Sequence, residues 1–183
     1  MARLNISIQK FMLSMRRGIT NCVDEVAIME RLSPNGYDSD RMNEGLDLCE
    51  KLEHAREKYE NLAAAQEKAT AERNEKKGEL KRYYKAHLEM SRKLFDKESA
   101  AYSALGLKGK RETSIPGITA QVQKFYNTAL ADPEIQDVLL RVNVDTAKLQ
   151  HGLDLLKELL DLETKQKAAM AEKEEARAEQ KKQ

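Results

Sequence analysis

The 183-residue sequence contains no tryptophan, and aromatic residues make up only 5% of it. With so few large rings we do not expect a thick mixed core. Charged residues reach 34%, against roughly 25% in ordinary globular domains, which favours long solvated helices. No run of 18 apolar residues is present, so the sequence predicts no membrane span. Residues 1–18 lack a continuous apolar centre and a small-residue cleavage site, so we expect no secretory signal.

The charge balance and the cysteine content likewise point to no ligand. The 32 basic and 31 acidic residues leave a net charge of +1, so no overall field would attract nucleic acid or an anionic membrane. The two cysteines, Cys22 and Cys49, have no CxxC spacing and lie within helical patterns, which is typical of reduced thiols. We therefore expect a cytoplasmic protein that does not bind nucleic acid.

Three prolines divide the chain into segments whose apolar residues recur every three or four positions. This spacing predicts helices that each bury one stripe. The first segment ends at Leu32, and Ser33–Tyr37 predicts a turn. Its stripe consists of Ile8, Met12, Met15, Ile19, Cys22, Val26 and Met29.

Capping residues mark where later helices begin. Asp38 or Ser39 can accept a hydrogen bond from the first turn of the second segment, and Asp145 or Thr146 can do the same for the last helix. Asp132-Pro133-Glu134 is a further strong start signal. The sequence therefore predicts an all-α protein, a bundle of long antiparallel helices of the coiled-coil kind, with loops at 33–37, 106–114 and 143–145.

The proline-free stretch over residues 38–105 allows two interpretations. The polar patch Asn74–Gly78 favours a reversal, followed by a return helix over about Glu79–Leu105 with Leu80, Tyr84 and His87 on its inner face. The alternative is one unbroken helix, which would reach ~90 Å at 1.5 Å per residue. We expect the hairpin.

An eight-residue phrase occurs twice in the sequence. Gly45–Leu52 reads GLDLCEKL, and Gly152–Leu159 reads GLDLLKEL, 107 residues later. Glycine inside a helix costs roughly 1 kcal/mol relative to alanine, so its reuse indicates close approach of a crossing helix. We therefore predict one and a half similar helical repeat units. Residues 1–106 form the first, with an N-terminal helix, a long helix and a return helix; residues 107–183 form a second, incomplete unit with a charged C-terminal helix.

Several of these motifs resemble a family of uncharacterised bacterial all-helical repeat proteins with a GLxL helix-start motif. They are Tyr37-Asp38, the GLxL phrase, the AxxALGLKGKR loop from Ala100 to Arg111, and KFYNTALADPE from Lys124. The resemblance covers roughly residues 35–165 and concerns helix starts, loops and crossings. It implies the helical fold but no activity, because the family has no catalytic motif. In that family the second unit usually completes its return helix, whereas this chain ends early.

The sequence contains no convincing arrangement of catalytic or metal-binding residues. His54, His87 and His151 lack the Glu-x-x-His pattern of di-iron bundles, and we expect His87 to be a core residue. The glycines of Gly106–Ser114 lack the spacing of a phosphate-binding loop. Bases and tyrosines alternate in Lys81–His87, but a shared helix face with Leu80 favours core packing. We therefore predict a non-enzymatic protein with no catalytic residues, cofactor, metal or small-molecule substrate.

The last helix carries two adjacent leucine stripes over about half of its circumference, more than one neighbour can bury. We predict that this face mediates self-association into a homo-oligomer and that the protein is structural. A head-to-tail contact that does not close would give a filament or tube, and a two-fold contact would give a dimer. The alternative is a helical adaptor that binds a different protein partner. The predicted interface residues are Gly152, Leu153, Leu155, Leu156, Leu159, Leu160 and Leu162.

Overall fold

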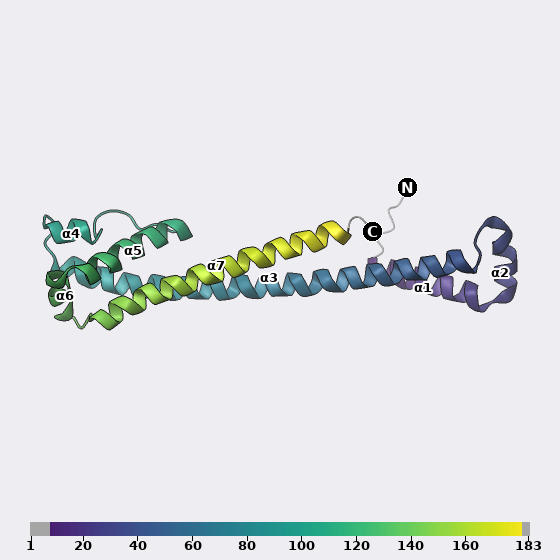
Figure 1. Ribbon diagram of the computed structural model, residues 1–183, viewed down its shortest axis with the longest axis horizontal. Coiled ribbons are helices and arrows are strands. Elements are labelled where there is room, and N and C mark those ends of the chain that lie inside the picture. The colour runs from purple at the N-terminus through teal and green to yellow at the C-terminus, as the bar shows by residue number, and fades with distance from the viewer. Residues whose placement is uncertain (1–7, 181–183) are drawn as a thin grey trace. The chain divides into compact units, whose positions relative to one another are not determined.

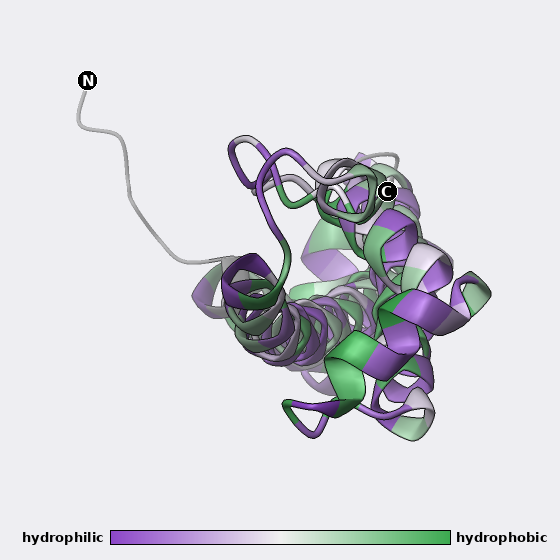
Figure 2. Cartoon of the chain, turned by 90° about the vertical axis from the view of Figure 1, so that its left-hand side faces the viewer, coloured by the Kyte–Doolittle hydropathy of each residue, from purple (hydrophilic) through white to green (hydrophobic). Residues whose placement is uncertain are grey.

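The computed structural model describes the backbone of residues 8–180 and the side chains of residues 10–179 (Figure 1). All regular secondary structure in this range is helical, which confirms the predicted all-α class. Hydrophobic and hydrophilic residues occur along the same helices, as expected when each helix buries one face (Figure 2). The helices are α1 (Ile8–Asp24), α2 (Val26–Leu32), the short 3₁₀ helix η1 (Ser33–Asn35), α3 (Ser39–Leu94), α4 (Ala100–Ala104), α5 (Ile115–Ala131), α6 (Pro133–Leu140) and α7 (Thr146–Gln180).

The chain forms two compact units. Among the residues that the structure describes, compact unit 1 consists of residues 8–65 and 170–180, and compact unit 2 of residues 66–169. The long helices α3 and α7 therefore each contribute to both units. These units are defined by packing; the boundary between residues 106 and 107 was drawn from the sequence repeat and stays a prediction.

The predicted turns and caps are present. The backbone amide of Arg41 donates to Asp38 at 2.9 Å, and that of Lys148 donates to Asp145 at 2.8 Å, so an aspartate caps the start of each long helix. Asp132 accepts from the first-turn amides of α6 at 3.0 and 3.3 Å. Gly36 closes the turn after η1 with φ +82°, a left-handed conformation that favours glycine.

The predicted hairpin at Asn74–Gly78 is wrong, because α3 runs without interruption for 56 residues (Figure 1). Tertiary contacts override the weak local helix propensity there. Arg73 pairs with Glu163 of α7 at 3.2 Å, and Lys76 pairs with Glu158 at 2.8 Å. The return helix over 79–105 is corrected accordingly: α3 continues to Leu94, and α4 follows as a separate short helix.

The N-terminal helix also differs from expectation. Glu25 adopts an extended conformation, with φ −103° and ψ 99°, and separates α1 from α2. The single stripe from Ile8 to Met29 is therefore broken. Met12 is buried, whereas Met15 and Val26 are exposed; the side chain of Ile8 lies outside the described residues.

Two arginines hold the loop between α4 and α5 by binding its carbonyl oxygens. Arg92 of α3 donates to the Leu107 carbonyl at 2.9 and 3.0 Å. Arg111 donates to the carbonyls of Gly106, Lys108 and Gly109 at 2.7–3.1 Å. Leu107 is thereby kept in the core of compact unit 2. The sequence predicts the loop but not the role of the two arginines that bind it.

The 107-residue offset found in the sequence recurs in the helix boundaries. Helices α1 and α5 begin at residues 8 and 115, α2 and α6 at 26 and 133, and α3 and α7 at 39 and 146. The residues that crowd the two glycines, Ile19 and Tyr126, also lie 107 positions apart. A Cβ added at Gly45 would lie 2.9 Å from Cδ1 of Ile19, and one added at Gly152 would overlap the Tyr126 ring. The predicted packing reason for these glycines is confirmed, since a crossing helix occupies the space of each missing side chain.

Candidate interaction surface

The leucines predicted to form a free surface lie in or against the core of compact unit 2. Leu155, Leu156 and Leu159 are fully buried, and Leu153 and Leu160 pack against the same cluster. Leu162 is half-buried, and Gly152 is buried beneath Tyr126. The predicted surface is therefore already covered by the chain itself. The reason is the uninterrupted course of α3, whose C-terminal part packs on α5 and α7 instead of returning along its own first half.

The exposed apolar residues are concentrated in compact unit 1. Nine of the ten large hydrophobic residues exposed in the described chain belong to it, whereas the main core cluster lies wholly in compact unit 2. Compact unit 1 thus has helices with apolar faces but little core of its own. The nine are Phe11, Leu13, Met15, Val23, Val26, Ile28, Tyr37, Leu48 and Met170.

A groove of about 460 Å³ runs between α1 and the beginning of α3. Its most exposed apolar side chains are Phe11 (52% exposed) and Met15 (42%) from α1 and Leu48 (59%) from α3. Leu52 is half-buried and Cys49 is buried. We call this the unit 1 groove; its lining is completed by Met12, Gly45 and Lys51.

The residues at the same positions in compact unit 2 are buried. Ile118 and Val122 of α5 lie 107 residues after Phe11 and Met15, and Leu155 and Leu159 of α7 lie 107 after Leu48 and Leu52. These four side chains are 0–4% exposed. The counterpart of the unit 1 groove is therefore part of a packed core.

Residues 73–94 of α3 make the contacts that cover this counterpart. Tyr84 packs edge to face on Phe125, with ring centroids 5.6 Å apart, and belongs with Leu80 and Leu88 to the same core cluster. The Tyr83 hydroxyl donates to the Lys148 carbonyl at 3.0 Å. The pairs Lys76–Glu158 and Arg73–Glu163 add opposite charges along α7. No such helix covers the unit 1 groove within the described part of compact unit 1, since Phe11, Met15 and Leu48 in its lining remain exposed.

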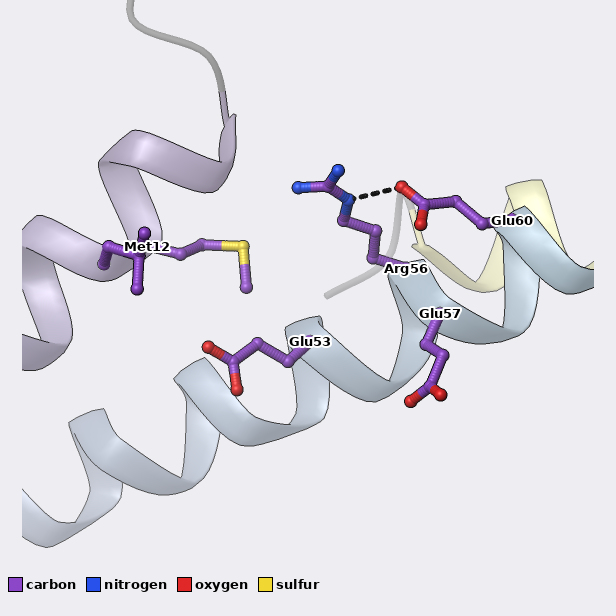
Figure 3. A pocket seen from close by; sticks show the side chains of 6 residues that line it. Met12, Glu53, Arg56, Glu57 and Glu60 are labelled. Carbon is purple, nitrogen blue, oxygen red and sulfur yellow. Dashed lines mark hydrogen bonds and ion pairs between the residues drawn. The ribbon is translucent and has the colours of Figure 1, made fainter.

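Acidic side chains dominate the α3 side of compact unit 1. Figure 3 shows a second pocket, of about 250 Å³, in which the Met12 thioether points from α1 toward Glu53, Arg56 and Glu57 of α3. Arg56 donates to Glu60 at 2.7 Å. Arg16 of α1 donates to Glu53 at 3.0 Å and to Glu50 at 3.5 Å. Residues 39–65 carry seven acidic and four basic side chains, whereas α1 carries three basic and one acidic.

A buried polar pair lies within compact unit 2. His87 is 5% exposed, and its Nδ1 lies 3.1 Å from the Tyr126 hydroxyl. Burial, and then the positive charge of Lys148, lower the pKa of His87 from 6.5 to about 4. His87 is thus the predicted core histidine, held neutral near pH 7.

The described residues show no metal cluster and no membrane helix. Their side chains contain no group of three or more His, Cys, Asp or Glu residues able to hold a metal ion. Each helix in residues 8–180 is too short or too polar to cross a membrane. Comparison with protein-family models, curated proteins and solved structures finds no match.

The groove was missed although the sequence contained its signal. Leu48 and Leu52 occupy the same arc of their helix as Leu155 and Leu159, so both long helices have an equally wide apolar face. What the sequence did not reveal is which of the two faces the chain covers. That depends on the straight course of α3 through residues 74–78, where a reversal was expected.

Proposed function

We propose that this protein is a non-enzymatic structural protein that self-associates through helix packing. The observation that supports the proposal is the concentration of exposed apolar side chains in compact unit 1. Large contiguous apolar patches on soluble proteins mark interaction sites, whereas scattered exposed leucines do not. Here Phe11, Met15 and Leu48 line one groove.

Burial of this surface would favour association. Complete burial of a fully exposed leucine, methionine or phenylalanine side chain contributes roughly 1.5–3 kcal/mol. Phe11, Met15 and Leu48 are 42–59% exposed, so each would contribute about half of this amount toward the estimated 4–15 kcal/mol that association costs. The repeated helix starts and crossings agree with an architecture built from similar helical layers.

Sedimentation equilibrium of the purified chain, over a hundredfold range of concentration, tests the proposal. We expect a mass that rises from 20.9 kDa to a multiple of that value as concentration increases. A mass of 20.9 kDa at all concentrations would exclude self-association. In that case the exposed surface would fit a helical adaptor for a different protein.

A further inference from the structure

We infer that a pocket in compact unit 2 binds a small organic carboxylate, with the charged group beside Lys81, Arg111 and the Tyr84 hydroxyl and the apolar body on the floor of the pocket. The inference goes beyond the proposed self-association, since none of these residues lines the unit 1 groove. Four observations support it: the construction of the pocket, its size, its uncompensated positive charge, and a hydroxyl donor without an acceptor.

The pocket lies between α3, α5 and the loop that joins α4 to α5. It brings together parts of two basic segments, Lys81–His87 and Gly106–Ser114, for which the sequence alone indicated no ligand. The floor is apolar, because Leu88, Ile118 and the ring of Tyr84 are only 2–7% exposed. The volume is about 200 Å³, below the roughly 300–1,000 Å³ of most small-molecule sites, so the pocket suits a small ligand.

Hydrogen bonds hold the loop wall of the pocket in place without a ligand. Gln121 of α5 donates from Nε2 to the Lys110 carbonyl at 3.1 Å, and its Oε1 accepts from the backbone amide of Glu112 at 3.2 Å. The bonds from Arg92 and Arg111 to other carbonyls of this loop act in the same way. A wall that is already ordered lowers the entropy lost when a ligand binds.

Two cations of the pocket have no carboxylate partner. Neither Lys81 nor Arg111 forms an ion pair with another described residue. Arg111 donates only to neutral acceptors, which are the carbonyls of its own loop and the Tyr84 hydroxyl. Its Nε is buried without a hydrogen-bond partner among the described residues. An uncompensated charge beside an unsatisfied buried donor favours the binding of an anion.

The acidic groups near the pocket leave one excess positive charge. Lys85, the third cation of the lining, already pairs with Glu89 at 3.7 Å. Glu112 also lines the pocket, is exposed, and offsets one of the two unpaired cations, Lys81 and Arg111. One remaining positive charge matches a carboxylate, whereas a phosphate monoester carries about −1.5 to −2 near pH 7.

The Tyr84 hydroxyl supplies a directional contact for the same group. It accepts from Nη1 of Arg111 at 3.1 Å, and no acceptor among the described residues takes its own proton. Burial raises the pKa of Tyr84, so the hydroxyl keeps this proton near pH 7. A carboxylate beside Arg111 can therefore accept a hydrogen bond from Tyr84 as well. Hydrogen bonds to a charged acceptor are stronger than those between neutral groups.

Benzoate and benzamide test the ligand class, because they have nearly the same shape and differ in charge. In ligand-observed NMR titrations of the parent chain, we expect a dissociation constant for benzoate on the order of 1 mM, and at least roughly tenfold weaker binding of benzamide. Acetate, which lacks the apolar body, should also bind at least roughly tenfold more weakly than benzoate. No benzoate binding, or equal affinities for benzoate and benzamide, would overturn the inference.

Lys81→Gln and Lys93→Gln test the location. Both lysines belong to α3 and form no ion pair with a described residue, but only Lys81 lines the pocket. We expect Lys81→Gln to weaken benzoate binding roughly threefold, with benzamide binding unchanged, and Lys93→Gln to change neither. Far-ultraviolet circular dichroism should match that of the parent in both variants. Equal weakening of benzoate by the two changes would exclude this pocket.

Tyr84→Phe tests the hydroxyl, since it keeps the buried ring and removes only the donor. We expect benzoate to bind roughly fivefold more weakly than to the parent. An unchanged affinity in a folded variant would contradict the proposed position of the carboxylate.

Phenyl phosphate separates the two anionic head groups. We expect it to bind more weakly than benzoate, and tighter binding would exclude a carboxylate as the preferred ligand. These titrations record the signals of the small molecule, so they give the same answer for a monomer and for an assembly. A failure of the carboxylate site and a failure of self-association are therefore distinguishable.

Discussion

At the scale of single residues, Gly45 and Gly152 hold the same place in two helices but face different neighbours. A methyl group at Gly45 would meet Cδ1 of Ile19 at 2.9 Å, the end of a flexible side chain. A methyl group at Gly152 would overlap the rigid ring of Tyr126, which is fully buried and cannot move aside. A side chain at Gly152 should therefore destabilise the fold far more than one at Gly45.

We expect Gly152→Ala to lower the free energy of unfolding by about 1–3 kcal/mol, as overpacking of a core does. Gly45→Ala should be nearly neutral, because a small shift of Ile19 is offset by alanine's advantage of about 1 kcal/mol within a helix. Urea unfolding followed by circular dichroism measures both. Equal losses in the two variants would contradict this explanation of the repeated glycine.

His87 makes stability depend on pH. Its pKa is about 4 in the folded protein and 6.5 when unperturbed, so the unfolded chain binds the proton more readily. The contribution is complete above pH 6.5 and is lost as the pH falls toward 4. We expect the free energy of unfolding to drop by about 2 kcal/mol between pH 7.5 and pH 5 from this residue alone.

The control for this prediction is His87→Gln, which can still hydrogen bond but does not titrate. The difference in unfolding free energy between parent and variant should change with pH over this range, since the carboxylates are common to both chains. A constant difference between pH 7.5 and pH 5 would show that His87 does not take up the proton preferentially in the unfolded state.

At the scale of elements, the continuity of α3 is the feature that determines which surfaces the chain covers. Gly78 lies inside this helix, and the nearest atom to an added Cβ is an Arg82 nitrogen at 3.7 Å, an ordinary contact. Gly78→Ala should therefore raise the free energy of unfolding by up to about 1 kcal/mol. In a reversal at this position, alanine would replace a turn glycine and destabilise the protein. Urea unfolding distinguishes the two, and a loss of stability would argue against the continuous helix.

Local signals in the sequence predicted the starts of the helices well. Asp38, Asp132 and Asp145 can each satisfy a first-turn amide, and each does so in the structure. This chemistry acts over three residues and needs no tertiary context. The course of the chain through 74–78 could not be predicted in this way, because Arg73 and Lys76 are held by carboxylates some 80–90 positions away.

The candidate surface could likewise be predicted only in part. The sequence shows the wide apolar arcs of both long helices, including the leucines at 155, 156 and 159. Whether such an arc is buried depends on which helix packs on it. The break at Glu25 was also hidden, since the apolar spacing from Met12 to Met29 continues across it.

At the scale of the whole molecule, the two compact units differ in how much of their apolar surface the chain covers. In compact unit 2, residues 73–94 of α3 pack on α5 and α7. Ile118, Val122, Leu155 and Leu159, which correspond to the unit 1 groove, are buried there. Compact unit 1 leaves Phe11, Met15 and Leu48 exposed. We propose that self-association covers these side chains.

Hydrogen–deuterium exchange at concentrations above and below assembly tests this claim most directly, because it reports association and its location together. We predict slower exchange on assembly in peptides that cover α1 and residues 39–52, with no change in peptides from α5 and α6. Slower exchange confined to α5, α6 and residues 146–162, or identical exchange at all concentrations, would contradict the account.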